Sequence, residues 1–401
     1  MNLPRLLAFY FLTMTASMLA MAQPRPLVLV HYMPWYESKE ISGKWGWHWT
    51  MNGRFNPDHI QPNGQRDIAS HHYPLLGAYD SRDPDLLACH TQLMQITGID
   101  GVIIDWYGCQ NFRAYPKIHQ STQHLIESIK QAGLKYAICY EDRTIEAISE
   151  QKQLSPTQEI ELCQQDLAWL SKHCFSDPAY VKLAGRPILP VFGPVHFKTP
   201  QQWQSILSNV SPKPAFYALP HMTQQTNADG SFGWPPVHGG KEISTHQWKK
   251  YLQTLYSQKT DKTIAIAFPR FQDIYSTSYG SIDPRGTKTF SESLHLAKQS
   301  NAPIIQIATW NDFGEGTVIE PTIQTSYQYL ELLQKSLNPK TTPQDLRLPI
   351  QLYHLKKYYH SNQKIRTELQ NASRQITLGN LPAARSLILP YLNTPTIPLG
   401  E

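Results

Sequence analysis

The chain has 401 residues, of which 41% are hydrophobic and 11% aromatic, so it can bury a large core and is neither disordered nor fibrous. Its net charge of +5 is mild, and Lys and Arg are spread along the chain, so nothing supports nucleic-acid binding. The chain is rich in Trp (10) and Tyr (21), whose flat rings suit the faces of sugars, although most aromatic side chains pack in cores.

The N-terminus has the pattern of an export signal. Arg5 provides a positive charge, residues 6–19 are apolar, and Ala20-Met21-Ala22 is a small-x-small cleavage site. An uncleaved anchor is the alternative, but the apolar segment is short and no stop-transfer pattern follows it. We therefore predict that residues 1–22 are a signal peptide and that the mature protein is secreted or periplasmic, without membrane attachment.

From Pro26 onward, short apolar runs alternate with amphipathic helical stretches, which is the pattern of a parallel β/α protein. We predict eight strands, at residues 27–32, 102–106, 136–140, 188–192, 215–219, 232–234, 264–268 and 304–310. Eight strands alternating with helices indicate an α/β fold of the (β/α)8 type, a TIM barrel. An open doubly wound sheet is the rival, but no Gly-rich phosphate loop follows the first strand.

The helices between these strands should begin at recognisable caps. A Ser or Thr followed three residues later by Gln or Glu is a capping box, and we predict such starts at Ser155, Thr199, Ser244, Thr289 and Thr325. Asp83 before Pro84 predicts a further N-cap.

The first βα loop, from Glu37 to about Arg82, is unusually long, and long ordered loops are often functional. It contains Trp45-Gly46-Trp47-His48-Trp49, where period-two spacing would place three indoles on one face of an extended ribbon. The rings would either stack on sugars or pack on the barrel as a staple, and both interpretations stay open.

The last predicted strand leads into an acidic turn. Asp312 and Glu315 stand three residues apart beside glycines, so the backbone can turn sharply and aim both carboxylates at one point. Paired carboxylates flanked by an aromatic ring suit glycosidic bond cleavage, where one acid protonates the leaving oxygen and the other assists attack at the sugar. The alternative is a strand that ends in a solvated turn.

Aromatic and ionisable residues recur at the other strand ends, where the chemistry of such barrels collects. We predict Asp312 and Glu315 as catalytic residues. The predicted substrate-binding residues are His31, Tyr32, Trp35, Tyr36, Trp47, Trp49, Asp105, Trp106, Tyr107, Glu141, Trp234, Trp310 and Asn311.

The sequence has no metal or cofactor signature. The five cysteines fit no zinc motif, and the His71-His72 pair lacks partners at ligand spacing. An odd cysteine count leaves at least one thiol free, and Cys139 inside a strand is expected to be buried. No phosphate or flavin motif appears either, so we predict neither a metal nor a cofactor.

The character of the chain changes after residue 337. Residues 338–343 are typical of a linker, and helical stretches follow at 350–359, 363–376 and 381–389. We predict a catalytic barrel over residues 23–337 and a linker with a small C-terminal helical appendage over 338–401. A single partner-binding helical repeat is an alternative for the appendage, and we expect a monomer.

Four segments resemble the glycoside hydrolase family 71/99-like group: residues 31–36, 45–49, 101–108 and 310–321. The resemblance implies a (β/α)8 barrel that hydrolyses α-linked polysaccharide, usually in an endo fashion and without a metal. Family 99, the endo-α-mannosidases and endo-α-mannanases, has the motif Trp-Asn-Glu-x-x-Glu, whose first acid acts as a base on the sugar 2-hydroxyl and whose second is the general acid, with retention. Those roles fall on Asp312 and Glu315.

The chain departs from that motif because Asp312 stands where family 99 has Glu. The run Trp-Asn-Asp-Phe-Gly-Glu at residues 310–315 is instead similar to family 71, the inverting α-1,3-glucanases, whereas residues 316–321 follow the family 99 form. We therefore predict a secreted glycoside hydrolase that cleaves α-mannan or α-glucan, with endo action. The alternative is a non-catalytic glycan-binding barrel that retains the aromatic cleft.

Overall fold

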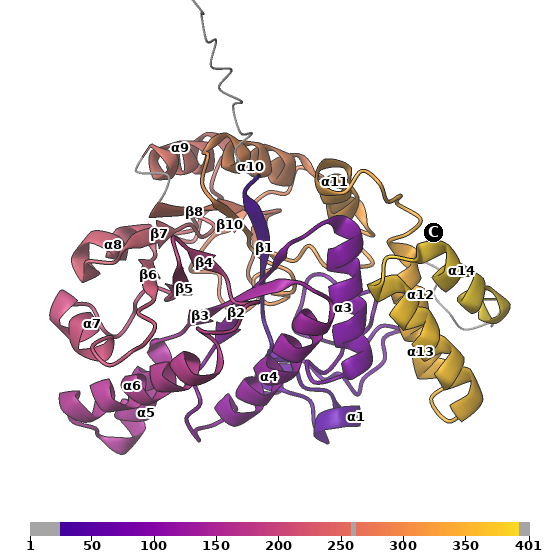
Figure 1. The fold of residues 1–401 in the computed structure, drawn as a ribbon, viewed down its shortest axis with the longest axis horizontal. Helices are drawn as coiled ribbons and strands as arrows, with labels where there is room; N and C mark the ends of the chain where they lie inside the picture. The colour runs from indigo at the N-terminus through magenta and orange to yellow at the C-terminus, as the bar shows by residue number, and fades with distance from the viewer. Residues whose placement is uncertain (1–24, 258–261, 393–401) are drawn as a thin grey trace, which may run out of the picture.

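The computed structural model describes residues 25–257 and 262–392, and the predicted signal peptide lies outside them. Parallel strands form a curled sheet at the centre of the molecule, and helices surround it (Figure 1). The eight strands of the barrel are β1 (Leu27–Tyr32), β2 (Gly101–Trp106), β3 (Lys135–Tyr140), β5 (Arg186–Pro190), β6 (Ala215–Ala218), β7 (Gly230–Phe232), β8 (Thr263–Ala267) and β11 (Ile304–Ile307).

The sheet closes into a barrel through hydrogen bonds between its two ends. The strands follow the order β3-β2-β1-β11-β8-β7-β6-β5, and the short antiparallel β4 (Lys182–Leu183) pairs with β5. The N–H of Phe192 donates to the carbonyl of Tyr140 at 2.9 Å, and that of Val181 donates to Tyr136 at 2.8 Å. These bonds join β3 to the chain on either side of β5, so the (β/α)8 prediction is confirmed.

Strands β8 and β11 consist mainly of Ile and Ala, which suit burial on both faces. Every residue of β8 and β11 is buried. The predicted strand at 304–310 ends earlier, at Ile307, so residues 308–310 already belong to the loop that follows. The strand predicted at 232–234 is shifted to Gly230–Phe232, which leaves Trp234 beyond the strand end.

Capped helices connect the strands. The capping boxes predicted at Ser155, Thr199 and Ser244 are confirmed, and the Asp83 carboxylate accepts from the backbone N–H of Asp85. The barrel helices are α3 (Pro84–Thr97), α4 (Tyr115–Gln131), α5 (Arg143–Lys152), α6 (Pro156–His173), α7 (Pro200–Ile206), α8 (Pro220–Thr226), α9 (Thr245–Tyr256), α10 (Lys288–Gln299) and α11 (Gln328–Leu337).

Two predicted caps are wrong. Helix α10 begins at Lys288, so Thr289 lies inside it, where its hydroxyl donates to the carbonyl of Asp283 at 2.7 Å. Helix α11 begins at Gln328, and Thr325 lies in the turn before it. The capping pattern fails here because Ser and Thr hydroxyls also form local hydrogen bonds in turns and first helical turns.

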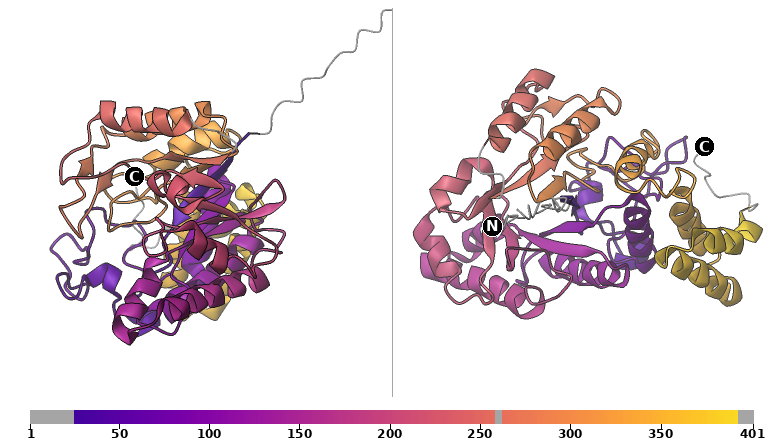
Figure 2. Two further views of the ribbon diagram at one scale, coloured as in Figure 1. Left: turned by 90° about the vertical axis from the view of Figure 1, so that its left-hand side faces the viewer. Right: turned by 45° about the horizontal axis from the view of Figure 1, so that its top comes forward.

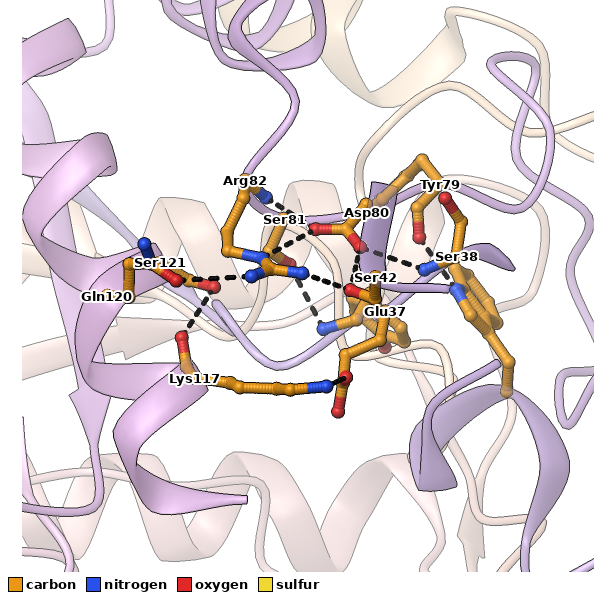
Figure 3. Close-up of polar contacts among 12 residues, drawn as sticks. Glu37, Ser38, Ser42, Tyr79, Asp80, Ser81, Arg82, Lys117, Gln120 and Ser121 are labelled. Carbon is orange, nitrogen blue, oxygen red and sulfur yellow. Dashed lines mark hydrogen bonds and ion pairs between the residues drawn. The ribbon is translucent and has the colours of Figure 1, made fainter. Parts of the chain in front are cut away.

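The long loop between β1 and α3 is tied together at its base (Figure 3). The Asp80 carboxylate accepts from the N–H of Ser38 at 3.0 Å and from the side chain of Arg82 at 3.3 Å. Lys117 of α4 pairs with Glu37, at the start of the loop. Because both ends of the loop are joined to each other and to α4, the residues between them have a fixed place above the barrel.

Residues 45–49 are not the extended ribbon that their period-two spacing predicted. A helical turn, α2 (Trp47–Thr50), occupies most of this segment, and successive side chains there diverge by about 100° instead of alternating. Trp49 is fully buried, and its indole N–H donates to the carbonyl of Tyr79 at 2.8 Å, so this ring is a staple. Trp47 is 43% exposed. Helix α1 (Lys39–Ser42) precedes this segment.

Three C-terminal helices lie at the edge of the barrel, where the first two pack against α3 and the third packs on the second (Figure 2). The ammonium of Lys356 and the guanidinium of Arg366 both pair with Asp85 of α3, at 3.2 and 2.9 Å. His354 also reaches the long loop, with its Nε2 3.0 Å from the carbonyl oxygen of Leu75. The helices are α12 (Arg347–Tyr358), α13 (Gln363–Thr377) and α14 (Leu381–Ile388), followed by the 3-10 turn η2 (Leu389–Tyr391).

All five cysteines are free thiols, and all but the partly exposed Cys109 are buried. The expectation that at least one thiol stays free is confirmed, and Cys139 is buried within β3 as expected. Within residues 25–257 and 262–392, no helix combines the length and the apolar character needed to cross a bilayer.

A buried carboxylate ties the end of β3 to the loop after β5. Asp142 is fully buried and accepts hydrogen bonds from the backbone N–H groups of Val195, His196 and Phe197, at 2.8, 2.9 and 2.8 Å. The neighbouring Glu141 is thereby fixed at the barrel mouth.

We expect Asp142→Ala to lower the free energy of unfolding by roughly 2–4 kcal/mol, because it leaves three backbone N–H groups, one buried and two partly buried, without acceptors. Asp142→Asn, which keeps one acceptor oxygen, should lose less. Urea unfolding of the three proteins measures the difference. An Asp142→Ala protein within about 0.5 kcal/mol of wild type would contradict the tie.

Candidate active site

A cavity of about 1010 Å³ opens at the C-terminal ends of the barrel strands. Its lining draws on the segment after every one of the eight strands, as expected for a site in this fold. In chain order these segments contribute Trp35, Tyr107, Glu141, Phe192, Leu219, Trp234 and Tyr275, and the last strand contributes Asp312 and Glu315.

The loop that carries the two acids is attached to the end of β1. The Asn311 side chain forms a double hydrogen bond with the backbone of Met33: its oxygen accepts from the N–H at 2.8 Å, and its nitrogen donates to the carbonyl at 3.1 Å. The Tyr36 hydroxyl donates to the carbonyl of Asn311 at 2.9 Å and accepts from the N–H of Phe313 at 3.1 Å. Asn311 and Tyr36 thus position the acids from within the protein.

The opposite side of the acid loop is held by the segment after β8. The buried Arg270 guanidinium donates to the carbonyls of Gly316 and Val318, at 2.7 and 3.1 Å. The N–H of Gln272 donates to the carbonyl of Glu315 at 2.8 Å. The backbone of the acid loop is therefore fixed from both sides. The same segment forms a small hairpin of β9 (Phe271–Gln272) and β10 (Ser281–Ile282).

Asp312 is buried, with 2% of its surface exposed. Burial raises the pKa of its carboxyl to about 6, whereas a hydrogen bond from the Glu315 N–H to its Oδ1, at 3.0 Å, favours the charged form and limits the rise. The hydroxyl of Thr309 accepts from the N–H of Asp312 at 2.8 Å. This carboxylate is thus held in one place.

Glu315 has a different environment. Burial raises its pKa well above the usual value for Glu, and the nearby charges of Asp312 and Asp273 raise it further. The Trp234 indole opposes this rise by hydrogen bonding. The Oε2 atom of Glu315 is buried and has no hydrogen-bond partner within the described ranges. A carboxyl in such surroundings stays protonated at higher pH than its neighbour.

Beneath the acids lies a buried polar group. His31 of β1, Asp105 of β2 and Cys139 of β3 have potential ligand atoms within 4.8 Å of one another. Among the described residues, this cluster has the geometry closest to a metal site. The His31 Nδ1 lies 3.3 Å from the side-chain oxygen of Gln306, and burial lowers its pKa to about 4. Burial also disfavours the charged form of Asp105 and so raises the pKa of its carboxyl. Whether the protein works without a metal stays a prediction.

Residues 25–214 match the model of glycosyl hydrolase family 99. Two relatives are the glycoprotein endo-alpha-1,2-mannosidases of Mus musculus and Rattus norvegicus. The first is 24% identical over 346 residues, which cover 76% of this chain and 72% of the relative. The second is 24% identical over 321 residues, which cover 73% and 67%. This chain is a glycoside hydrolase that resembles family 99.

Solved structures agree on the fold. A GH99 endo-alpha-mannosidase from Bacteroides thetaiotaomicron superposes with a TM-score of 0.59 at 17% identity, over 78% of this chain and 96% of that chain. A glycoside hydrolase-like protein superposes with a TM-score of 0.55 at 13% identity, over 78% and 94%. The match to the family model ends before Asp312 and Glu315, so it does not test the roles predicted for them.

The structure brings part of the predicted site together and separates the rest. Cavity-lining residues from the predicted set are Trp35, Trp47, Tyr107, Glu141, Trp234, Asp312 and Glu315. The other eight lie outside this lining: His31 and Asp105 beneath it, Tyr36, Trp49 and Asn311 in the supporting loops, and Tyr32, Trp106 and Trp310 deeper in the protein.

The alternation of side chains along a strand explains why Tyr32 and Trp106 lie outside the cavity. His31 and Asp105 face the barrel interior of this family 99-like hydrolase, so the following residues, Tyr32 and Trp106, face the surrounding helices. The Tyr32 hydroxyl lies 2.9 Å from His90 of α3, and the Trp106 indole N–H lies 3.1 Å from His119 of α4. Alternation along β1 and β2 could have excluded both residues from the site.

Sequence reasoning missed other cavity residues. His48 lies flat against Trp35, with ring centroids 4.2 Å apart. Tyr275 lies in the segment after β8, seven residues beyond the predicted end of that strand. No motif marked either residue, because their places depend on how two loops fold over the barrel mouth.

Removal of the Tyr36 hydroxyl should loosen the acid loop. We expect Tyr36→Phe to lose about 1–3 kcal/mol of unfolding free energy and at least about tenfold in kcat, because the loop then lacks one of its ties to β1. A matched control is Tyr180→Phe, which also loses two buried hydrogen bonds, to Ile188 of β5 and Ile138 of β3, outside the cavity lining.

Tyr180→Phe should be destabilised to a similar degree but keep its kcat. Urea unfolding and steady-state kinetics on both variants separate the two effects. Equal kcat losses in Tyr36→Phe and Tyr180→Phe would contradict a positioning role for Tyr36.

Proposed function

We propose that the protein is exported and hydrolyses internal bonds of an α-linked polysaccharide, with α-mannan the first candidate and α-glucan the second. The observation that carries this proposal is the pair of carboxyls in different environments after β11, with Asp312 buried and Glu315 partly buried. The names of the relatives favour α-mannan. The signal-like residues 1–22 support export, and Met1 retained on mature protein would contradict it.

The two environments suggest the two roles. Hydrogen bonds from backbone N–H groups favour ionised Asp312, whereas Glu315 has an unpartnered oxygen and two acidic neighbours. Asp312 therefore loses its proton first. In the proposed mechanism, Glu315 gives a proton to the glycosidic oxygen as the bond to the anomeric carbon breaks, and Asp312 is the base.

Asp312 has two possible proton donors. If it takes the proton of the sugar 2-hydroxyl, that oxygen attacks the anomeric carbon, and water then opens the intermediate with overall retention. If it takes the proton of a water molecule, the hydroxide attacks directly and the configuration inverts. The anomer released first distinguishes the two routes.

The cavity walls suit a chain of sugars. Trp35, Tyr107 and Trp234 present aromatic rings beside the acids, and such rings pack on the apolar faces of sugars. Trp47 extends this surface to the rim of the cavity, where it remains 43% exposed. We propose these four residues, together with Glu141, as the substrate-binding wall of a monomeric enzyme.

We expect Glu315→Gln to abolish hydrolysis while the protein stays folded, because an amide cannot donate the required proton. NMR time courses with α-mannan, α-1,3-glucan and mixed α-glucans would follow new reducing ends and their first anomer. Glu150→Gln, an exposed substitution on α5, is the matched control and should keep full activity. Activity in Glu315→Gln would contradict the assignment, whereas binding without product in wild type would favour a glycan-binding barrel.

The pKa shifts predict a bell-shaped pH profile. The value of kcat/KM should rise as the pH passes through about 6, because Asp312 must lose its proton to act as a base. It should fall again at higher pH as Glu315, whose pKa is raised well above its usual value, loses the proton it must donate. Initial rates at low substrate concentration measure this profile. A rate that falls as the pH rises through 6 would reverse the two roles.

A further inference from the structure

The segment after β8 brings an unpartnered hydroxyl to the acid pair. Tyr275 lines the cavity, and its hydroxyl oxygen is buried without a hydrogen-bond partner within the described ranges. Burial and the charge of Asp312 raise its pKa, so the hydroxyl keeps its proton and is available as a donor. The proposed mechanism leaves this group unused.

The glycine between the acids makes room for this ring. A Cβ placed on Gly314 would lie 1.9 Å from the Tyr275 hydroxyl oxygen, far inside any real contact. The backbone N–H of Ile274 donates to the carbonyl of Gly314 at 2.8 Å. The phenol end of Tyr275 thus lies directly on the short stretch of backbone that separates Asp312 from Glu315.

Two other contacts fix the direction of the ring. The Asp273 carboxylate accepts from the backbone N–H of Tyr275 at 2.7 Å, which sets the turn from which the side chain leaves. Trp47, from the long loop after β1, stacks on the Tyr275 ring with centroids 5.2 Å apart and planes at 30°. The ring is therefore held between two loops that meet over the cavity.

A buried hydroxyl without a hydrogen-bond partner destabilises the folded state, and most buried hydroxyls in native proteins have a partner. The ring is held by Gly314, Asp273 and Trp47, and none of these contacts gives the hydroxyl a hydrogen bond. A partner that arrives with the ligand would satisfy it, and sugars present hydroxyl oxygens that accept hydrogen bonds.

We propose that Tyr275 is a substrate-binding residue whose hydroxyl donates a hydrogen bond to a hydroxyl oxygen of the sugar bound between Asp312 and Glu315. This inference rests on the proposed function. It makes the site selective for sugars that carry that hydroxyl group, because a sugar without it leaves the Tyr275 donor buried and unpaired.

The test is Tyr275→Phe, which removes one oxygen and keeps the ring. We expect kcat/KM on an α-mannooligosaccharide to fall about tenfold or more. The melting temperature should stay the same or rise, because the lost hydroxyl has no partner in the free protein. Tyr358→Phe, on the half-exposed Tyr358 of α12, is the control and should change neither quantity. A structural role would instead lower the melting temperature of Tyr275→Phe.

Monodeoxy versions of the same oligosaccharide identify the sugar hydroxyl. One of them should react slowly with wild type, and with that sugar Tyr275→Phe should cause no further loss, since the bond is already missing. Unchanged kcat/KM in Tyr275→Phe would overturn the inference and leave the proposed function intact.

If wild type hydrolyses no α-glycan, the proposed function fails, and calorimetry then compares binding of the same oligosaccharide by wild type and Tyr275→Phe. Weaker binding by Tyr275→Phe would support the hydroxyl contact, whereas equal binding or no binding would overturn it.

Discussion

The double hydrogen bond between the Asn311 amide and the Met33 backbone is the contact on which the mouth of the barrel depends. It joins the end of the first strand to the turn that follows the last one, where the carboxyls of Asp312 and Glu315 lie close enough for the charge of one to act on the other. Buried charge of one sign pushes a loop apart and draws in water. The neutral amide, the Tyr36 hydroxyl and the Arg270 guanidinium hold the backbone of this turn, so the carboxyl groups need few contacts of their own.

The barrel itself could be predicted from the sequence because its signal is local. Apolar runs such as 264–268 and 304–310 mark strands, and Ser155, Thr199 and Ser244 form the capping boxes they predict. Helix starts were predicted wrongly where a Ser or Thr side chain forms another local hydrogen bond in place of a cap, as at Thr289. The segment 45–49 folded as a helical turn because its surroundings outweighed its spacing.

The site was only partly predictable, because a strand end identifies a position without giving its direction. Asp312, Glu315 and Glu141 could be found from the types of residue that follow strands. Trp106 is aromatic and follows the same rule, yet it lies between helices because its neighbour Asp105 already faces inward. Tyr275 could not be found at all, since its place depends on a glycine in another loop and on a stacking partner far away in sequence.

The five unpaired thiols have a consequence for the conditions under which this protein can be handled. No cross-link among these cysteines has to form, so the described fold should tolerate a reducing cytoplasm, an oxidising periplasm or added dithiothreitol alike. Four thiols are shielded from oxidants by burial. The partly exposed one, Cys109, donates to Asp166, and burial together with that carboxylate raises its pKa to about 12, so it is rarely a thiolate and reacts slowly.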